Sequence, residues 1–250
     1  MSPLEKSSII FLCIFSGAAL GMVLRNALPE HHLNAETKDL IKLGVGLVGT
    51  MAALLLGLLV ASAKSAYDAK STELTQMAAS VIWLDRTLAH YGPETAPTRA
   101  TLKAAVSRFI DQLWPRDNTQ GGIGGQTGGG EIILDKVEEL APKTEAQRSY
   151  QSQAQSLAMN IGQMRWLLFE QSGSAISTPF LVVVVFWLTT LFVSFGMFAP
   201  RNATAFFVLI VSALSVAGAI YLILELDHPF SGLIQIPPMP LRNALRVLGQ

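Results

Sequence analysis

Long uncharged apolar runs dominate the hydrophobic pattern of this chain. The clearest pair covers residues 179–199 and 203–224, and the two runs are separated only by the polar turn Pro200, Arg201 and Asn202. Each run has about 20 residues, which is the length that an α-helix needs to cross ~30 Å of hydrocarbon. We therefore predict two antiparallel transmembrane helices joined by a hairpin turn.

Two further apolar runs precede this pair, at residues 8–24 and 43–63. The first has about 17 residues, the short limit for a span, and a secretory signal peptide is the alternative. No small-x-small cleavage site follows within a few residues and another apolar run comes soon after, so we favour a retained span. Gly17 and Gly21 in this run form a GxxxG pattern, which permits close helix approach but is common by chance.

The run at 43–63 carries a second pattern of small residues. Gly49, Ala53, Gly57 and Ala61 recur every four positions, so they form one narrow stripe along a helix, and leucines occupy much of the remaining surface. In lipid the hydrophobic effect does not drive helices together, and association relies on close packing at small residues. The stripe therefore predicts a helix–helix contact, and a pore-adjacent position of this helix is the alternative.

Residues 65–178 contain charges throughout and no run long enough to span a membrane. Apolar residues at helical spacing predict helices that begin near Leu74, Pro97, Glu131 and Thr144. Gly92 and Pro93 should end the first of these helices, and Thr144 with Gln147 predicts a capping box at the start of the last. Residues 118–130 are rich in glycine and read as a flexible linker. The predicted regions are 1–64 with two spans, 65–178 with a helical cytosolic region, 179–225 with two spans, and 226–250 with a Pro-rich cytosolic tail.

A distinctive turn follows the fourth span. Its predicted members, including the arginines placed near it, are Arg165, Glu225, Asp227, Pro229, Phe230, Gly232 and Arg242. Carboxylates in a partly dehydrated boundary layer are costly unless paired. We therefore predict that Glu225 or Asp227 pairs with Arg165 or Arg242, and that Pro229 and Gly232 shape the turn. The alternative is that both carboxylates are solvated beyond the end of the span.

Composition agrees with a membrane protein and adds no catalytic chemistry. Hydrophobic residues make up 50% of the chain, the mean hydropathy is +0.41, and charged residues are only 14%, below the ~25% of soluble domains. Lys plus Arg balance Asp plus Glu at 18 each, so a nucleic-acid partner is not expected. Cys13 is the sole cysteine. The His31–His32 pair lacks further spaced ligands, and we read the polar segment 26–42 that holds it as a solvated loop. We expect no enzyme activity, no metal site and no cofactor.

Several strings resemble a bacterial membrane-protein family that carries a domain-of-unknown-function label and is sometimes called the bestrophin-like domain family. They are WLDRTLAHYGPE at 83–94, AQR at 146–148, MRWLLFEQ at 164–171, PFLVVVVFWL at 179–188, FGMFAPRNAT at 195–204, LELDHPFSGLI at 224–234 and PLRNAL at 240–245. The resemblance covers most of the chain from Gly44 to Leu245. It implies architecture rather than chemistry, through a link to bestrophins, which are oligomeric anion channels with four-span subunits and cytosolic helices.

Together these observations predict an all-α integral membrane protein with four transmembrane helices and a helical cytosolic region inserted between the second and third spans. An even number of spans places both termini on one side, and that side holds all but four of the 18 Lys and Arg residues, so we expect it to be cytosolic in a bacterial inner membrane. We expect a homo-oligomeric ion channel with the second span near the pore and a small ion as ligand. The alternative is a non-conducting scaffold or sensor whose cytosolic helices bind a partner.

Overall fold

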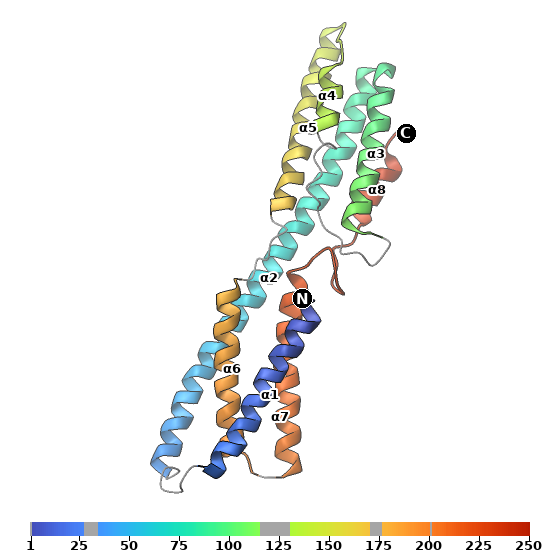
Figure 1. The fold of residues 1–250 in the computed structure, drawn as a ribbon. Helices are drawn as coiled ribbons and strands as arrows, with labels where there is room; N and C mark the ends of the chain where they lie inside the picture. Colours follow the sequence, from blue (N-terminus) through green and yellow to red (C-terminus); the bar gives the residue numbers. More distant parts are fainter. Residues whose placement is uncertain (1, 28–34, 116–130, 171–176, 201) are drawn as a thin grey trace. The chain divides into compact units, whose positions relative to one another are not determined.

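The computed structural model describes residues 2–27, 35–115, 131–170, 177–200 and 202–250. These residues are mostly helical and contain no β-strand, so the all-α class is confirmed for this part of the chain (Figure 1). The elements are α1 (Pro3–Ala27), α2 (Ala35–Tyr91), the 3₁₀ turn η2 (Pro93–Thr95), α3 (Ala96–Leu113), α4 (Glu131–Glu138), α5 (Glu145–Glu170), α6 (Thr178–Phe198), α7 (Ala203–Leu226) and α8 (Met239–Val247).

Four described helices are long and apolar enough to cross a membrane, namely α1, α2, α6 and α7. They contain the four apolar runs of the sequence, which confirms the prediction of four candidate spans. The glycine-rich segment 118–130, the pair His31 and His32, and Arg201 lie outside the described residues.

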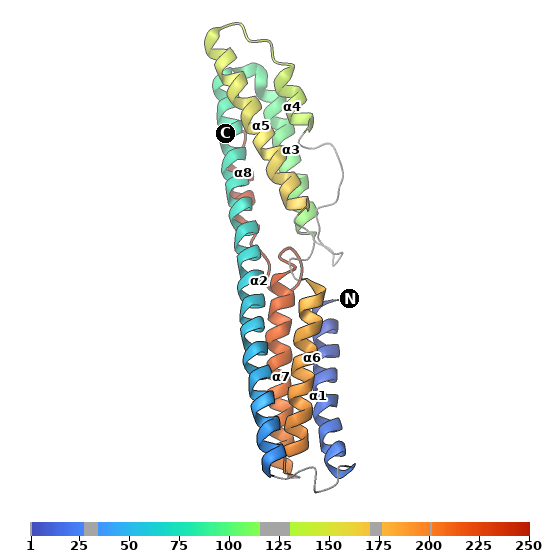
Figure 2. The same ribbon diagram turned by 90° about the vertical axis from the view of Figure 1, so that its left-hand side faces the viewer.

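The chain divides into two compact units. Unit 1 comprises residues 1–65 and 175–227, and unit 2 comprises residues 66–174 and 228–250. In unit 1, α1, α6, α7 and the first part of α2 run beside one another (Figures 1 and 2). Unit 2 contains the rest of α2, the helices α3 to α5, and α8.

The helix α2 differs from the sequence prediction at its start and in its middle. We expected a polar loop up to Lys42 and separate helices for residues 43–63 and from Leu74 onward, whereas one helix of 57 residues begins at Ala35. The reason is local, because residues 64–73 contain neither glycine nor proline and nothing there interrupts the helical hydrogen bonds. The helix ends where the sequence predicted, before Gly92, whose φ of 147° disfavours other residues.

The helix α5 begins at the predicted capping motif. The Thr144 hydroxyl accepts a hydrogen bond from the Gln147 backbone N–H at 3.1 Å. The Gln147 side-chain oxygen accepts from the backbone N–H of Lys143 at 2.8 Å rather than from that of Thr144. Both bonds satisfy donors at a helix start that have no partner within the helix.

Each unit has its own apolar core. Core side chains of unit 1 come from all four spans and include Ile14, Ala52, Ala63, Val184, Leu188, Ala213 and Ile220. Core side chains of unit 2 come from α2 to α5 and from the C-terminal segment, and they include Leu74, Leu84, Leu88, Val106, Val137, Ala158, Leu168, Phe230, Ile236 and Leu241. The segment after the fourth span is therefore part of the core of unit 2.

The helices α1 and α6 approach each other closely in unit 1. A Cβ atom on Gly21 would overlap the Val193 carbonyl, and one on Gly196 would overlap the Ala18 carbonyl. A Cβ atom on Gly17 would lie 2.9 Å from a methyl carbon of Thr189. The GxxxG pattern of the first span thus makes a backbone-to-backbone contact that no other residue type could make.

Candidate functional site

The candidate functional site is the surface of α2 within unit 1. One side of α2 packs into the unit 1 core through Ala52, Leu59 and Ala63, which are buried. In the most apolar stretch of α2 only 11% of the residues are buried, against 33–39% in the other three spans. The second span therefore leaves far more of its surface uncovered in the single chain than the others do.

The predicted small-residue stripe lies on this uncovered surface. Ala53, Gly57 and Ala61 are exposed, and a Cβ atom on Gly57 would meet nothing within 4 Å. Gly49 is half-buried, and a Cβ there would lie 3.7 Å from a methyl carbon of Leu191 in α6. Except at Gly49, the stripe does not form a helix–helix contact within the described part of unit 1.

A leucine-rich face also lies on the uncovered surface of α2. Its members recur at spacings of three, four and seven residues, and each is at least 63% exposed: Leu40, Leu43, Leu47, Leu54 and Leu58. Leucine is the side chain expected against lipid tails, whereas glycine and alanine are expected where another helix or a pore lies close. The two faces of α2 therefore suit different neighbours.

The hairpin turn between α6 and α7 is stabilised by polar contacts to its backbone. Asn202 is the residue before α7, and its side-chain oxygen accepts a hydrogen bond from the Ala205 backbone N–H at 2.7 Å. This is the usual way in which asparagine caps a helix start. The Arg25 guanidinium of α1 donates to the Ala199 carbonyl, and the Asn202 backbone N–H donates to the Pro200 carbonyl.

The segment after α7 forms a closed turn within unit 2. The Pro229 carbonyl accepts from the Ile236 backbone N–H at 2.8 Å, and Gly232 has a φ of 91°, which favours glycine. The Phe230 ring meets the Trp114 ring edge to face at 5.8 Å, and the Trp114 indole N–H donates to the Ile236 carbonyl at 3.0 Å. The turn is thereby attached to the end of α3.

The charged residues predicted near this turn belong to different units. Glu225 and Asp227 are in unit 1 and are 2% and 5% exposed, whereas Arg165 and Arg242 are in unit 2. The predicted pairing would join residues of two units that are each described separately. The pairing therefore stays a prediction.

Sequence reasoning missed a buried ion pair in unit 2. Asp85 on α2 accepts two hydrogen bonds from Arg99 on α3, from Nε and from Nη2, both at 2.8 Å. The Asp85 side chain is 2% exposed, and its hydrogen bonds raise the pKa of Arg99 above the ordinary value. Arg99 and Arg86 also donate to the Gln250 carbonyl, which attaches the C-terminal segment to both helices. Asp85 and Arg99 lie 14 positions apart in the sequence, and no sequence motif links them.

The described residues hold no group of three or more His, Cys, Asp or Glu side chains that could bind a metal ion. The candidate site is thus a surface of small and apolar side chains, and its geometry suits packing or a pore.

Comparison with known proteins assigns a family to this architecture. A family model described as a bestrophin-like domain matches residues 12–241. No curated protein matches the sequence.

Solved structures of similar fold cover nearly the whole chain. Crystal structures of two point mutants of a bacterial bestrophin homologue from Klebsiella pneumoniae match with TM-scores of 0.68, at 13% and 15% identity. The first match covers 98% of this chain and 100% of the other, and the second covers 100% and 99%. A crystal structure described as a membrane protein matches with a TM-score of 0.67 at 14% identity, over 98% and 99% of the two chains. At these identities the likeness shows the fold.

Proposed function

This chain belongs to the bestrophin-like domain family, and we propose that it forms a homo-oligomeric ion channel in which α2 of each subunit lies near the pore. The observation that carries the proposal is the exposed small-residue face of α2, formed by Ala53, Gly57 and Ala61. Small side chains on a transmembrane surface let neighbouring helices approach closely or leave room for an ion path. In a symmetric ring, the α2 helices of several subunits would surround the axis.

The exposed surface of α2 favours partners over a lone subunit. Glycine and alanine stabilise a transmembrane helix chiefly by letting another helix pack closely against them. When they face lipid tails instead, those van der Waals contacts are not made. The resemblance to bestrophins, which are oligomeric anion channels, supports the same arrangement. The ligand that we propose is a small ion that passes through the channel. The protein itself would be surrounded by the lipid bilayer.

For the location we propose a bacterial inner membrane, with both termini and residues 65–178 on the cytosolic side. The support is the distribution of Lys and Arg along the sequence. Glu138 is exposed on α4 and suits a labelling test in a Cys13→Ser background. A cysteine introduced there should resist an impermeant thiol reagent in intact cells and react after lysis, and labelling from outside would reverse the orientation.

A non-conducting scaffold or sensor is the second candidate. It is favoured by the absence of charged residues from the apolar runs at 8–24, 43–63, 179–199 and 203–224, since ion pathways often carry ionisable groups within the membrane. Pores can also be lined by apolar side chains, which is why the channel remains our first proposal.

Ion flux separates the two candidates. The purified protein is reconstituted into liposomes loaded with a chloride-sensitive dye or a potassium-sensitive dye, and flux is compared with that of empty liposomes. Flux that depends on the protein supports the channel, and its absence from correctly folded, oligomeric protein supports the scaffold.

Substitutions on α2 test the role of the small-residue face. Ala53→Leu and Gly57→Leu should each lower flux at least about tenfold or reduce the oligomer to smaller species, since added bulk separates helices that depend on close packing. Gly218→Leu on α7 is the matched control, because a Cβ at Gly218 also meets nothing within 4 Å. Wild-type flux and size in both α2 variants would contradict the proposed position of α2.

The boundary pairing is a separate proposal about stability. We propose that Asp227 pairs with Arg242, or Glu225 with Arg165, and the low exposure of both carboxylates supports a charged partner. A double-mutant cycle on each pair measures the coupling energy. Coupling of about 3 kcal/mol is expected for a well-buried pair, and zero coupling in both cycles would contradict it.

A further inference from the structure

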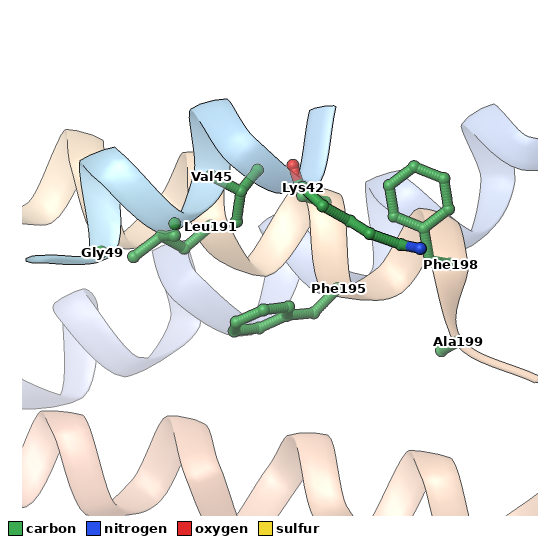
Figure 3. A pocket seen from close by; sticks show the side chains of 9 residues that line it. Lys42, Val45, Gly49, Leu191, Phe195, Phe198 and Ala199 are labelled. Atoms are coloured by element: carbon green, nitrogen blue, oxygen red, sulfur yellow. The ribbon is translucent and has the colours of Figure 1, made fainter. Parts of the chain in front are cut away.

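A pocket of about 520 Å³ lies between α2 and α6 in unit 1 (Figure 3). It is open rather than enclosed. Apart from Lys42 and Ser194, the residues that line it offer apolar side chains or glycine: Val45, Gly46, Gly49, Leu191, Phe195, Phe198 and Ala199. The pocket is therefore an apolar cavity with one cationic side chain.

The cation stands at one end of this pocket. Lys42 directly precedes the uncharged run at 43–63, and α6 ends at Phe198, so this end coincides with the limit of both apolar segments. Figure 3 shows the Lys42 side chain extended toward Phe198, with Phe195 and Leu191 farther along α6. The pocket thus has a charged end at the membrane boundary and an apolar remainder that continues along the spans.

Two further polar groups lie at this pocket. Ser194 is 8% exposed and lines it. The Arg25 guanidinium donates to the carbonyl of Ala199, which itself lines the pocket, and so adds a second positive charge near the same boundary. A bound molecule with an anionic end would meet Lys42 there, and Arg25 adds positive charge nearby.

We propose that this pocket binds an anionic phospholipid, with the phosphate at the Lys42 ammonium and an acyl chain against Leu191 and Phe195. An ordered water cluster is a poor occupant, because a buried water needs two to four polar partners and the apolar part of the pocket offers only the Ser194 hydroxyl. Basic groups beside apolar grooves between transmembrane helices are the chemistry that binds anionic lipid headgroups. The inference does not depend on whether the protein conducts ions.

The ion pair between Lys42 and Asp39 does not prevent this binding. The two side chains are 67% and 71% exposed and their charged atoms are 3.2 Å apart. Exposed pairs of this kind contribute ~0–1 kcal/mol, so the ammonium can exchange the carboxylate for a phosphate at little cost.

Lipid binding is measured by native mass spectrometry of the intact protein, released from detergent and titrated with phosphatidylglycerol or phosphatidylcholine. We expect phosphatidylglycerol to bind more tightly. Lys42→Gln should weaken its binding about fivefold, the value of ~1 kcal/mol for one basic residue at a lipid surface, while Lys42→Arg retains it. Lys38→Gln is the matched control, since Lys38 lies near the same boundary but does not line the pocket.

A second variant tests the apolar part of the pocket. A Cβ on Gly46 would meet nothing within 4 Å, so Gly46→Leu should fold while its side chain fills the cavity. This variant should bind both phosphatidylglycerol and phosphatidylcholine more weakly. Equal binding of phosphatidylglycerol to wild type, Lys42→Gln and Gly46→Leu would overturn the proposal. So would displacement of the lipid by millimolar inorganic phosphate, or a changed oligomer size in Gly46→Leu with lipid binding intact, which would assign the pocket to a second copy of the chain.

Discussion

The α1–α6 contact of unit 1 and the α2–α3 contact of unit 2 join helices by opposite means. Between α1 and α6 the backbones themselves meet, at Gly21 and Gly196, and no ion pair is involved in the contact that these glycines make. Between α2 and α3 side chains meet, through apolar residues such as Leu84 and Val106 and through the ion pair of Asp85 with Arg99. The difference follows from what surrounds each pair of helices.

Lipid tails are as apolar as leucine, so burying leucine between two spans gains little, and close backbone contact supplies the attraction through van der Waals packing. Helices with charged outer faces, such as α3 and α5, gain from removing apolar side chains from water, at ~25 cal/mol per Å². An ion pair is then tolerable in the core because it is hydrogen-bonded on both oxygens. The two units should therefore respond to different mutations.

The largest effect is expected at the glycines of unit 1. Gly21→Leu places a side chain where the Val193 carbonyl lies, so α1 and α6 must separate along their length. We expect a loss of more than about 4 kcal/mol, beyond ordinary overpacking, because backbone rather than a side chain must move. The check is the free energy of unfolding in mixed detergent micelles with increasing SDS.

The control for this substitution is Gly218→Leu, at a glycine of α7 whose Cβ position is open. It should unfold like the wild type within ~0.5 kcal/mol, as is usual at exposed positions. Equal stability of Gly21→Leu and the control would contradict the claim that the glycine contact stabilises the packing of α1 against α6.

The next effect is expected at the ion pair of unit 2. Asp85→Ala removes two hydrogen bonds from the Arg99 guanidinium, whose side chain is 19% exposed and keeps its bond to the Gln250 carbonyl, so the loss should be about 2–3 kcal/mol. Guanidinium-induced loss of the helical circular dichroism signal, with the protein in nanodiscs, measures the change.

An exposed ion pair in the same unit serves as the control. Glu145 and Arg148 are 3.1 Å apart, and their side chains are 87% and 68% exposed, so Glu145→Ala should cost less than about 1 kcal/mol. Similar losses for Asp85→Ala and Glu145→Ala would mean that burial does not strengthen the Asp85 pair.

A smaller effect is expected where the C-terminal segment meets α3. Trp114→Phe keeps an aromatic ring beside Phe230 but removes the N–H that donates to the Ile236 carbonyl. We expect a loss of about 1–2 kcal/mol in the same guanidinium titration, the usual cost of leaving a polar group unpaired. Trp166→Phe, at a ring that is 52% exposed, should be nearly neutral, and an equal loss there would show a general cost of replacing tryptophan.

The smallest effect, and one of opposite sign, is expected at Tyr91. Its hydroxyl is buried with no hydrogen-bond partner among the described residues, so Tyr91→Phe should leave stability unchanged or raise it by up to ~1 kcal/mol at pH 7. Burial, with a contribution from the charge of Glu94, raises the pKa of Tyr91 above 10.0.

The pH dependence supplies the check on Tyr91. Because the folded state holds the phenol proton more tightly than the unfolded state, wild-type stability is intact below pH ~10 and falls as the pH rises through the unfolded and then the folded pKa. The Tyr91→Phe variant lacks this loss, so its advantage should be constant up to about pH 9 and grow as the pH rises through and above about 10. A constant difference would place the Tyr91 hydroxyl in contact with water.

The sequence by itself determined the number and approximate bounds of the spans. An uncharged run of about 20 residues has one inexpensive arrangement in lipid, a helix that satisfies its own backbone groups, so α1, α6 and α7 follow from composition alone. The amphipathic patterns of α3 and α5, and the turns at Gly92 and Thr144, were also predictable because their causes are local.

Only the tertiary structure decided which small and which charged residues meet. Gly17 with Gly21, and Ala53 with Gly57, are both pairs of small residues four positions apart, yet Cβ atoms on the first pair would clash with α6, whereas one on Gly57 would meet nothing within 4 Å. The partner of Asp85 was equally hidden, since Arg99 lies on the next helix. Local pattern records which residues permit close approach, whereas contact depends on how helices from distant parts of the chain cross, and that is set by the packing of all their side chains together.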